Sequence, residues 1–522
     1  MSETSASSRH DYRSHSGLLT CVALLLFTLV YFWRSILLAK TTALDVDEVF
    51  ITWIVRFFPA GKVFDALKMG LDSKAPGYYW LLDGFATVFG QTTLALRLPS
   101  ILGFYVFALS VFQVLRKFVE WQIAVCAVFF TCLTGAAYAS TLIQPYALVL
   151  GCFGVAAAGW VDFPSSRHRR LCGLLTVLAL AIALSVHFLA IYLVVALGIA
   201  ELIRSWCDRK IQGGYWLCLA ASSATLLLWL PVIAPIFRMT HSSIKAPGFY
   251  APPTVWRLFG LFMGLLRGND FEQVDLILAL LLIPLMLVAA RSGWSWLAAP
   301  FSVPSTGREA DLRDLDILTF AALALPFITF AFSVLVTGSF NMRYFLAAVL
   351  GLILLAARGL HALRDGVQLA GLLLALTVGW VAIGWANDMV MPVYDPRIAL
   401  IRHAPEQLPV VLPSATDFFS LSEAAPPDLR SHIAFVGMPG GLSSPDPEPE
   451  LLARNWKAAI PSLAVYTGDQ WFEKTKVFYV LYTSDPREGL TDWLLAHAQT
   501  QIIAHAGSIW LLRVDVSNMN LR

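Results

Sequence analysis

The sequence predicts an all-α polytopic membrane protein that carries a small α/β domain at its C-terminal end. Of the 522 residues, 57% are hydrophobic and only 14% are charged, and the mean hydropathy is +0.67. Soluble globular chains are closer to half apolar and a quarter charged. After Asn387 the composition becomes polar and rich in proline. These observations predict a helical membrane domain over residues 18–386 and a soluble domain over residues 387–522.

About eleven windows are long and apolar enough to cross a bilayer, since a spanning helix needs roughly 20 mostly apolar residues. The first window follows a polar tail of residues 1–17 and has no small-x-small cleavage motif at its end, so we expect an uncleaved helix with a cytoplasmic tail. The windows lie near residues 18–38, 97–116, 120–139, 142–161, 171–186, 188–205, 215–235, 273–290, 317–337, 342–357 and 367–386.

Basic residues gather in the loops on one side of these windows, whereas the short outer turns near Ser140 and His187 contain neither Lys nor Arg. By the positive-inside rule the basic loops are cytoplasmic, and eleven spans then place everything after Ala386 on the outer side. The inner loops hold Arg116, Lys117, Arg167, Arg169, Arg170, Arg204, Arg209, Lys210, Arg291, Arg308, Arg313, Arg358 and Arg364.

The first outer segment, residues 39–96, begins with three acids, Asp45, Asp47 and Glu48. An apolar stripe with helical spacing follows and predicts a helix that lies in the membrane interface, ended by Pro59 and Gly61. Residues 77–89 predict a second short helix. The stripe consists of Val49, Phe50, Trp53, Ile54, Phe57 and Phe58.

The soluble C-terminal region alternates short apolar runs with helix-like stretches, which is typical of a small α/β domain. The runs predict strands at 410–412, 433–436, 477–482 and 509–514, and residues 490–497 predict a helix. No nucleophile elbow, phosphate loop or metal motif occurs in it.

Two interpretations of the three acids stay open. Asp and Glu at the start of a helix routinely cap its free N–H groups and complement its dipole. Three carboxylates within four residues exceed what capping needs, however, and an ionised carboxylate can act as the general base for an acceptor hydroxyl. Such a group can also hold a divalent cation, Mg²⁺ or Mn²⁺, although no full ligand set is visible in the sequence.

Three cations are expected on the outer face. Lys74 precedes an Ala-Pro-Gly turn, Arg97 lies at the outer end of the second window, and Arg343 lies at the outer start of the tenth. Contact with lipid headgroups is one explanation for each of them. Alternatively, lysine supplies a fixed positive charge and arginine a bidentate contact for a lipid phosphate.

Several other polar and aromatic residues have both a structural and a functional interpretation. His187 and Gln144 suit hydrogen bonds at helix ends. Tyr78 and Tyr79, with Trp80 beside them, suit an interfacial aromatic belt, and sugar rings also stack on such side chains.

Other classes of function are not indicated. The net charge of +2 is too small to indicate nucleic-acid binding, and no basic tract that would read a phosphate backbone is present. The seven cysteines all lie in or beside apolar segments, none follows Cys218, and none has the spacing of a zinc site.

Taken together, the motifs resemble those of the GT-C superfamily of polyprenyl-phosphate-sugar-dependent glycosyltransferases, in the branch with protein O-mannosyltransferases and lipid A aminoarabinose transferases. The resemblance covers about residues 18–400. It is carried by the DE pair after the first window, K-x-P-x-Y-Y-W at 74–80, RLPS at 97–100, YASTLIQPYALVL at 138–150, SVHFLAIYL at 185–193 and NMRYFLAAVLGLILLAARGL at 341–360.

The resemblance implies a multi-span bundle with a catalytic first outer loop, in a bacterial inner membrane with a periplasmic C-terminal domain. It implies Asp47 as base beside Glu48, Lys74 as the phosphate ligand, and Arg343 with Tyr344 as donor contacts. Two departures bear on these roles. Asp45 is an extra acid, so either aspartate is a candidate base, and Gln144 stands where relatives usually have arginine.

The implied reaction is inverting transfer of a sugar from a polyprenyl-phosphate donor to a lipid, glycan or protein acceptor, as in lipopolysaccharide or protein glycosylation. Mannose, glucose, a uronic acid and an amino-pentose all stay open as the sugar. A transporter or flippase of polyprenyl-linked sugars or lipids is the alternative, although such proteins place polar groups at the bilayer midplane and often show repeats, and neither is seen here. A third possibility is a purely structural membrane protein with an outer sensor domain. In such a protein the loop acids could be replaced without a phenotype.

Overall fold

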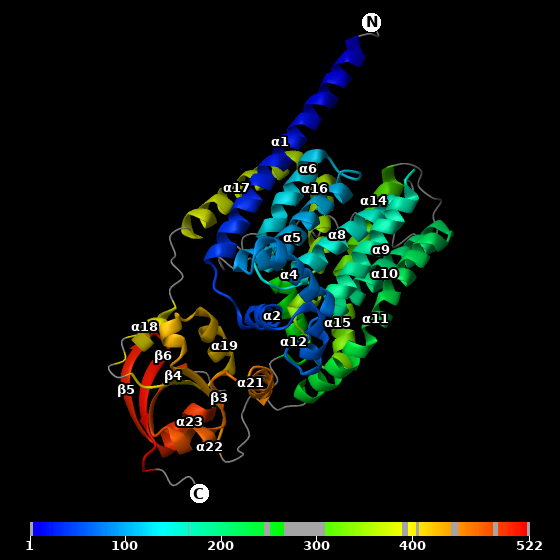
Figure 1. The fold of residues 1–522 in the computed structure, drawn as a ribbon. Helices are drawn as coiled ribbons and strands as arrows, with labels where there is room; N and C mark the ends of the chain where they lie inside the picture. Colours follow the sequence, from blue (N-terminus) through cyan, green and yellow to red (C-terminus); the bar gives the residue numbers. More distant parts are fainter. Residues whose placement is uncertain are drawn as a thin grey trace. The chain divides into compact units, whose positions relative to one another are not determined.

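The computed structural model describes residues 4–164, 166–244, 251–265, 308–388, 395–402, 404, 407–439, 447–483 and 489–518 (Figure 1). The chain divides into two compact units. The helical unit comprises Met1–Lys40, Lys74–Leu230 and Pro253–Val390. The C-terminal unit comprises Thr41–Ser73, Pro231–Pro252 and Met391–Arg522. The first outer segment, residues 39–96, is therefore divided between the two units, whereas its sequence predicts that all of it belongs to the membrane domain.

The helical unit is built from long α-helices joined by short turns. Figure 1 shows α5, α8 and α9 side by side. The helices are α1 (Thr4–Thr41), α4 (Pro76–Phe89), α5 (Thr93–Leu115), α6 (Trp121–Phe130), α7 (Ala136–Ala139), α8 (Tyr146–Asp162), α9 (Arg169–Val186), α10 (Ile191–Asp208), α11 (Gly213–Ile244), α12 (Val255–Gly264), α14 (Arg308–Leu323), α15 (Leu325–Phe332), α16 (Ala348–Ala362) and α17 (Gly366–Asp388). Shorter turns are η2 (Thr131–Leu133), η3 (Phe188–Ala190), η4 (Ser333–Thr337) and η5 (Met342–Tyr344).

Six helical segments within the described ranges are long and apolar enough to cross a membrane. Shorter apolar helices accompany them at Trp121–Leu133, Tyr146–Asp162, Ala348–Ala362 and Gly366–Gly379. The chain is therefore a helical membrane protein, as its composition predicts. The six segments are Gly17–Thr41, Thr93–Leu115, Arg169–Val186, Phe188–Asp208, Gly213–Ala234 and Leu312–Thr337.

The windows at 120–139 and 342–357 are among those that differ from one continuous helix, and the window at 273–290 lies outside the described residues. In the window at 120–139, α6 ends at Phe130, where the Thr131 hydroxyl donates to the Val128 carbonyl (2.6 Å) and Thr134 donates to Thr131 (2.8 Å). Such hydroxyls compete with the helical hydrogen bonds of the backbone. In the window at 342–357, the Asn341 side chain accepts from the Arg343 N–H and caps η5, so α16 begins only at Ala348.

Helices α5 and α8 pack closely through glycines. A Cβ on Gly103 would meet the backbone of Leu148, and a Cβ on Gly151 would meet the backbone oxygen of Gly103. Small residues let helix backbones approach closely in membrane proteins, where apolar burial adds little to helix association. The contacts at Leu148 and Gly151 lie in the first two turns of α8, which begins at Tyr146. They therefore help to fix the position of Tyr146.

The change Gly151→Val is expected to lower the thermal stability of the detergent-solubilised protein. The obstructing atoms are backbone, so the two helices must separate, and overpacking of this kind costs about 1–3 kcal/mol. The matched control is Gly84→Ala in α4, where an added Cβ would meet nothing within 4 Å. Equal melting temperatures for the two variants would contradict the proposed close packing.

A buried ion pair ties α8 to α10. Arg204 pairs with Glu201 and donates from Nη1 to the Trp160 carbonyl (3.0 Å). The Trp160 indole N–H donates to Glu201 Oε2 (3.0 Å). Since both charged groups are buried, these hydrogen bonds offset the desolvation of the pair. Arg204, which the sequence analysis counted with an inner loop, lies within α10.

The C-terminal unit contains a six-stranded sheet in the order β3-β2-β1-β4-β6-β5, which confirms the predicted α/β domain. Strands β1, β2, β3 and β4 pair in parallel, and β4–β6 and β6–β5 pair antiparallel. The strands are β1 (Val410–Leu412), β2 (Ile433–Val436), β3 (Val465–Tyr466), β4 (Val477–Thr483), β5 (Gln499–Ala506) and β6 (Ile509–Asp515).

The helices of the C-terminal domain cover both faces of the sheet, since every residue of β1 and β2 is buried. Phe472 and Leu494 pack with Val411 and Val480 in the core on one face, and Phe418 packs on Phe435. The helices are α18 (Pro396–Arg402), α19 (Ala415–Ala424), α20 (Pro427–Arg430), α21 (Pro447–Ala459), α22 (Gly468–Lys474) and α23 (Gly489–His497).

The acidic start of the first outer segment folds with this domain. The segment forms α2 (Val46–Phe57), η1 (Ala60–Lys62) and α3 (Val63–Lys68). The predicted helix is present as α2, and its end at Phe57 agrees with the predicted stop before Pro59. Its apolar stripe does not lie open to a membrane interface as predicted, because Phe50 and Trp53 are buried and pack on Phe419 and Trp456. With 12 residues, α2 is too short to span a bilayer.

Candidate functional site

The helical unit brings together a group of cations and aromatic rings from four distant segments. The His187 ring lies 5.2 Å from the Tyr146 ring and 6.5 Å from the Tyr344 ring, measured between centroids. The Arg343 guanidinium carbon lies 5.9 Å from the Tyr146 centroid, and Lys74 and Arg343 both act electrostatically on His187. We call Lys74, Tyr146, His187, Arg343 and Tyr344 the basic–aromatic cluster.

Breaks between helices position each member of the cluster. His187 is the extended residue (φ −155°, ψ 114°) that separates α9 from η3, and its N–H still donates to the Ala183 carbonyl (2.9 Å). Tyr146 begins α8, and Arg343 lies in the turn η5. Pro76, which suits the first turn of a helix, starts α4 two residues after Lys74.

A close helix contact brings Lys74 and His187 to the same end of the unit. The Cβ that Gly77 lacks would lie 2.5 Å from the Ser185 carbonyl oxygen. Gly77 lies in the first turn of α4, just after Lys74, and Ser185 lies in the last turn of α9, just before His187. Only glycine therefore permits this approach.

Two positive charges of the cluster act on the imidazole of His187. Burial, and then the charges of Lys74 and Arg343, lower the pKa of His187 to about 3, so the imidazole is neutral at physiological pH. Within the described residues, His187 Nε2 is buried and has no hydrogen-bond partner. A phosphate placed here would meet two positive charges and one neutral imidazole, which can donate a hydrogen bond.

The remaining predicted residues of the helical unit are buried away from solvent. Tyr78 and Tyr79 in α4 are both 0% exposed, so neither lies on the outer surface as a belt residue would. Gln144 is buried, and its backbone carbonyl accepts from the Ser100 hydroxyl (2.8 Å). Arg97 is 0% exposed and donates from Nη1 to the Ala39 carbonyl (3.0 Å). That bond ties α5 to the end of α1.

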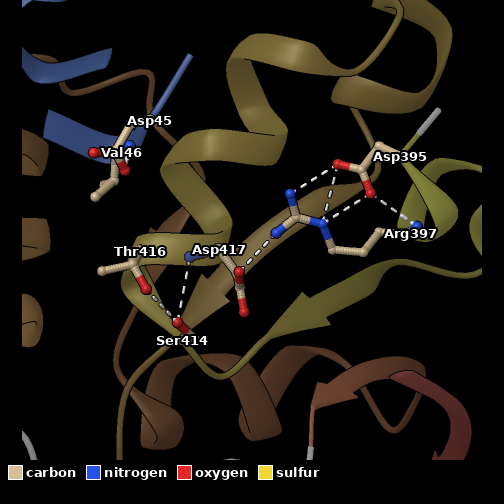
Figure 2. Close-up of polar contacts among 7 residues, drawn as sticks. All are labelled: Asp45, Val46, Asp395, Arg397, Ser414, Thr416 and Asp417. Carbon is tan, nitrogen blue, oxygen red and sulfur yellow. Dashed lines mark hydrogen bonds and ion pairs between the residues drawn. The ribbon is translucent and has the colours of Figure 1, made fainter. Parts of the chain in front are cut away.

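In the C-terminal unit, two of the three acids cap α2. Asp45 is the N-cap, and its Oδ1 accepts from the Val46 N–H (2.7 Å; Figure 2). Glu48 is fully buried, and its Oε2 accepts from the Asp45 N–H (2.9 Å), which completes a capping box. Asp47, which is half-buried in the first turn of α2, is not part of this box. The capping interpretation is therefore confirmed for Asp45 and Glu48.

The change Asp45→Ala is expected to speed hydrogen exchange in the first turns of α2, because a lost N-cap costs about 1 kcal/mol of helix stability. The control is Asp45→Ser, which keeps a side-chain oxygen at the cap. Exchange rates in residues 46–50 that are the same in Asp45→Ala, Asp45→Ser and the unaltered protein would contradict the capping role.

The C-terminal unit also contains a charged cluster that was not predicted from the sequence. Arg397 donates to both oxygens of Asp395 and, from Nη1, to Asp417 Oδ1 (2.6 Å; Figure 2). Burial raises the pKa of Asp417, and Arg397 opposes that rise. Asp395 and Arg397 are close in sequence, but nothing local to Asp417 indicates this contact. The cluster joins the start of α18 to the start of α19.

A metal site is not evident from the side chains described. Within the described ranges, no three His, Cys, Asp or Glu residues are close enough together to hold a metal ion. Asp47 belongs to the C-terminal unit and Lys74 to the helical unit. The meeting of the acid with the cations, expected from the sequence, stays a prediction.

No protein-family model matches the chain, and none of the curated proteins matches it. Among solved structures, ArnT from Cupriavidus metallidurans in its apo state is 15% identical, over 96% of this chain and 98% of that chain, with a TM-score of 0.45. The same protein bound to undecaprenyl phosphate is 14% identical over 94% and 97%, with a TM-score of 0.43. The apo oligosaccharyltransferase of Archaeoglobus fulgidus is 13% identical, over 79% of this chain and 64% of that chain, with a TM-score of 0.43. The chain is thus similar to ArnT along nearly all of its length, and to the oligosaccharyltransferase along a smaller part.

Proposed function

We propose that this chain is a GT-C-type membrane glycosyltransferase. It would move a sugar from a polyprenyl-phosphate donor to a hydroxyl of a lipid, glycan or protein acceptor on the periplasmic face of a bacterial inner membrane. The observation that carries the proposal is the basic–aromatic cluster, in which two cations act electrostatically on a buried neutral histidine. The sequence motifs at Lys74 and Arg343 support the same assignment.

In the proposed reaction the cluster binds the phosphate that leaves. Lys74 contributes a compact charge, and Arg343 contributes a planar guanidinium that suits two phosphate oxygens. In the neutral imidazole of His187 the proton is on Nε2, and this N–H donates a hydrogen bond to another oxygen of the phosphate. Negative charge develops on the phosphate as its bond to the anomeric carbon breaks, and fixed donors stabilise that charge more in the transition state than in the ground state.

Asp47 is the proposed general base. It takes the proton of the acceptor hydroxyl while the acceptor oxygen bonds to the anomeric carbon and the carbon–phosphate oxygen bond breaks. Direct displacement inverts the anomeric configuration and releases polyprenyl phosphate. Among the three acids, Asp47 is the one that the DE motif of the sequence assigns as base. The start of a helix also favours an ionised carboxylate through its dipole.

Loss of the gene from its native cell, followed by mass spectrometry of lipids, glycans and glycoproteins, tests this function. The proposal expects one species to lose the mass of a single sugar while the unmodified acceptor accumulates. The unaltered chain restores the mass, and a Lys74→Ala, Arg343→Ala chain does not. Unchanged masses, or full restoration by the double variant, would contradict it. Accumulation of the intact donor on the inner face alone would indicate a flippase instead.

A further inference from the structure

One carboxylate of the C-terminal domain binds two side chains of the helix that carries Asp47. Glu423 in α19 accepts from the Trp53 indole N–H (2.8 Å). Its two oxygens also accept from Arg56, at 3.1 Å from Nη1 and 3.0 Å from Nη2. Although burial acts in the opposite direction, the hydrogen bonds from Arg56 and Trp53 lower the pKa of Glu423, which is therefore ionised at neutral pH. We call these three residues the Glu423 contact.

Aromatic rings surround the Glu423 contact on the same face of α2. Phe50 packs edge-on against Phe419 (4.8 Å between centroids) and lies parallel to Trp456 (6.0 Å). Trp53 packs edge-on against the same two rings, at 5.4 and 5.5 Å. Phe419 and Trp456 are fully buried and come from α19 and α21. Aromatic pairs of this kind contribute energy beyond the burial of their area and also have a preferred geometry.

The capping box orders the first turn of α2, and Glu423 ties its third turn to α19. Packing of rings alone would permit some rotation of α2 about its axis. Three charge-assisted hydrogen bonds with fixed directions restrict that rotation, and so they restrict the direction in which Asp47 points. Trp53 lies six residues after Asp47, about 9 Å along the helix, so Glu423 acts on Asp47 only through the helix.

We propose that the C-terminal domain is the scaffold of the catalytic helix, and that Glu423 is a positioning residue that orients Asp47 through Trp53 and Arg56. This inference rests on the proposed function for the role of Asp47. Glu423 makes no bond to substrate in the proposal, and its contribution lies in keeping the base in one orientation.

The kinetic test uses the full chain in lipid nanodiscs with a polyprenyl-phosphate-sugar donor. Glu423→Ala is expected to lower kcat about 100-fold, since a small misplacement of a reacting group costs about that much. The KM for the donor is expected to stay within about twofold, because phosphate binding is assigned to other residues. Glu423→Gln, which still accepts from Trp53, is expected to recover most of kcat. Glu450→Ala, which removes a carboxylate paired with the exposed Arg454 in α21, is the matched control and should leave kcat unchanged.

Hydrogen exchange of residues 46–57 in the same full-chain samples separates this inference from the proposed function. Faster exchange confined to α2 in Glu423→Ala, together with the loss of kcat, supports the positioning role. Faster exchange with unchanged kcat, or unchanged exchange at α2, would overturn it. If Glu423→Ala fails to fold, Trp53→Phe, which keeps a ring and loses the N–H, takes its place under the same criteria. An active Asp47→Asn would remove the proposed base, and exchange at α2 would still report whether Glu423 holds the helix.

Discussion

Asp47→Asn is expected to lower the rate of sugar transfer by about 100- to 10,000-fold, the usual contribution of a general base. The amide keeps the size of the side chain and removes its ability to take a proton from the acceptor hydroxyl. Since Asp47 lies outside the capping box, the substitution leaves both bonds of that box in place. The measurement is single-turnover transfer by the purified chain in nanodiscs with saturating donor.

Asp45→Ser is the matched control for that experiment. It changes the neighbouring aspartate and keeps a capping oxygen, so transfer is expected to continue at nearly the original rate. Melting temperatures show whether both variants are folded. Full transfer by Asp47→Asn would exclude Asp47 as the base, and loss of transfer in Asp45→Ser alone would move that role to Asp45.

Lys74→Ala and Arg343→Ala are each expected to reduce transfer by about 100- to 1,000-fold, the typical loss when one fixed donor to a developing anion is removed. Both variants are also expected to bind polyprenyl phosphate more weakly than the unaltered protein. Arg343→Lys is expected to recover only part of the loss, because an ammonium group cannot make the bidentate contact. Transfer assays and titration with polyprenyl phosphate in nanodiscs measure the two effects.

The matched control is Lys40→Ala, which removes an exposed lysine near the end of α1. It should bind polyprenyl phosphate as the unaltered protein does. Arg97 is unsuitable as a control because it is buried and binds the Ala39 carbonyl, so its removal is expected to affect folding. A Lys74→Ala, Arg343→Ala chain that binds polyprenyl phosphate normally would contradict the role of the cluster.

The sequence predicted the parts of the fold that depend on local patterns. Apolar length and composition predicted most of the membrane helices, and the alternation of apolar runs predicted β1, β2, β4 and β6. The strand β5 was missed because it is mostly exposed, and its sequence QTQIIAHA gives little contrast between faces. The end of α6 was missed because it depends on hydroxyl–backbone bonds at Thr131 and Thr134, which a hydropathy window does not weigh.

The candidate site was predictable only in part. The motifs drew attention to Lys74, His187 and Arg343, and the structure brings these three residues together. The same motifs also drew attention to Arg97, which the structure uses to join two helices. Sequence spacing could not show whether Arg97 binds a phosphate or joins two helices. Its partner, the Ala39 carbonyl, lies 58 residues away in the chain.

The contacts of α2 with the C-terminal domain could not be predicted, because they join residues that are far apart in the chain. Glu423 lies 370 residues after Trp53, in α19, a helix that the sequence analysis does not predict. No periodicity in α2 indicates that its aromatic face packs on a domain at the other end of the chain. The grouping of Thr41–Ser73 with the C-terminal residues therefore required the structure.

An experimental structure of the chain with bound polyprenyl phosphate, determined by electron cryo-microscopy in nanodiscs, tests the central claim most directly. The expected density places the phosphate between the Lys74 ammonium and the Arg343 guanidinium, with His187 Nε2 at about 3 Å from one phosphate oxygen. A phosphate bound elsewhere, with Lys74, His187 and Arg343 unchanged and not in contact with it, would contradict the account.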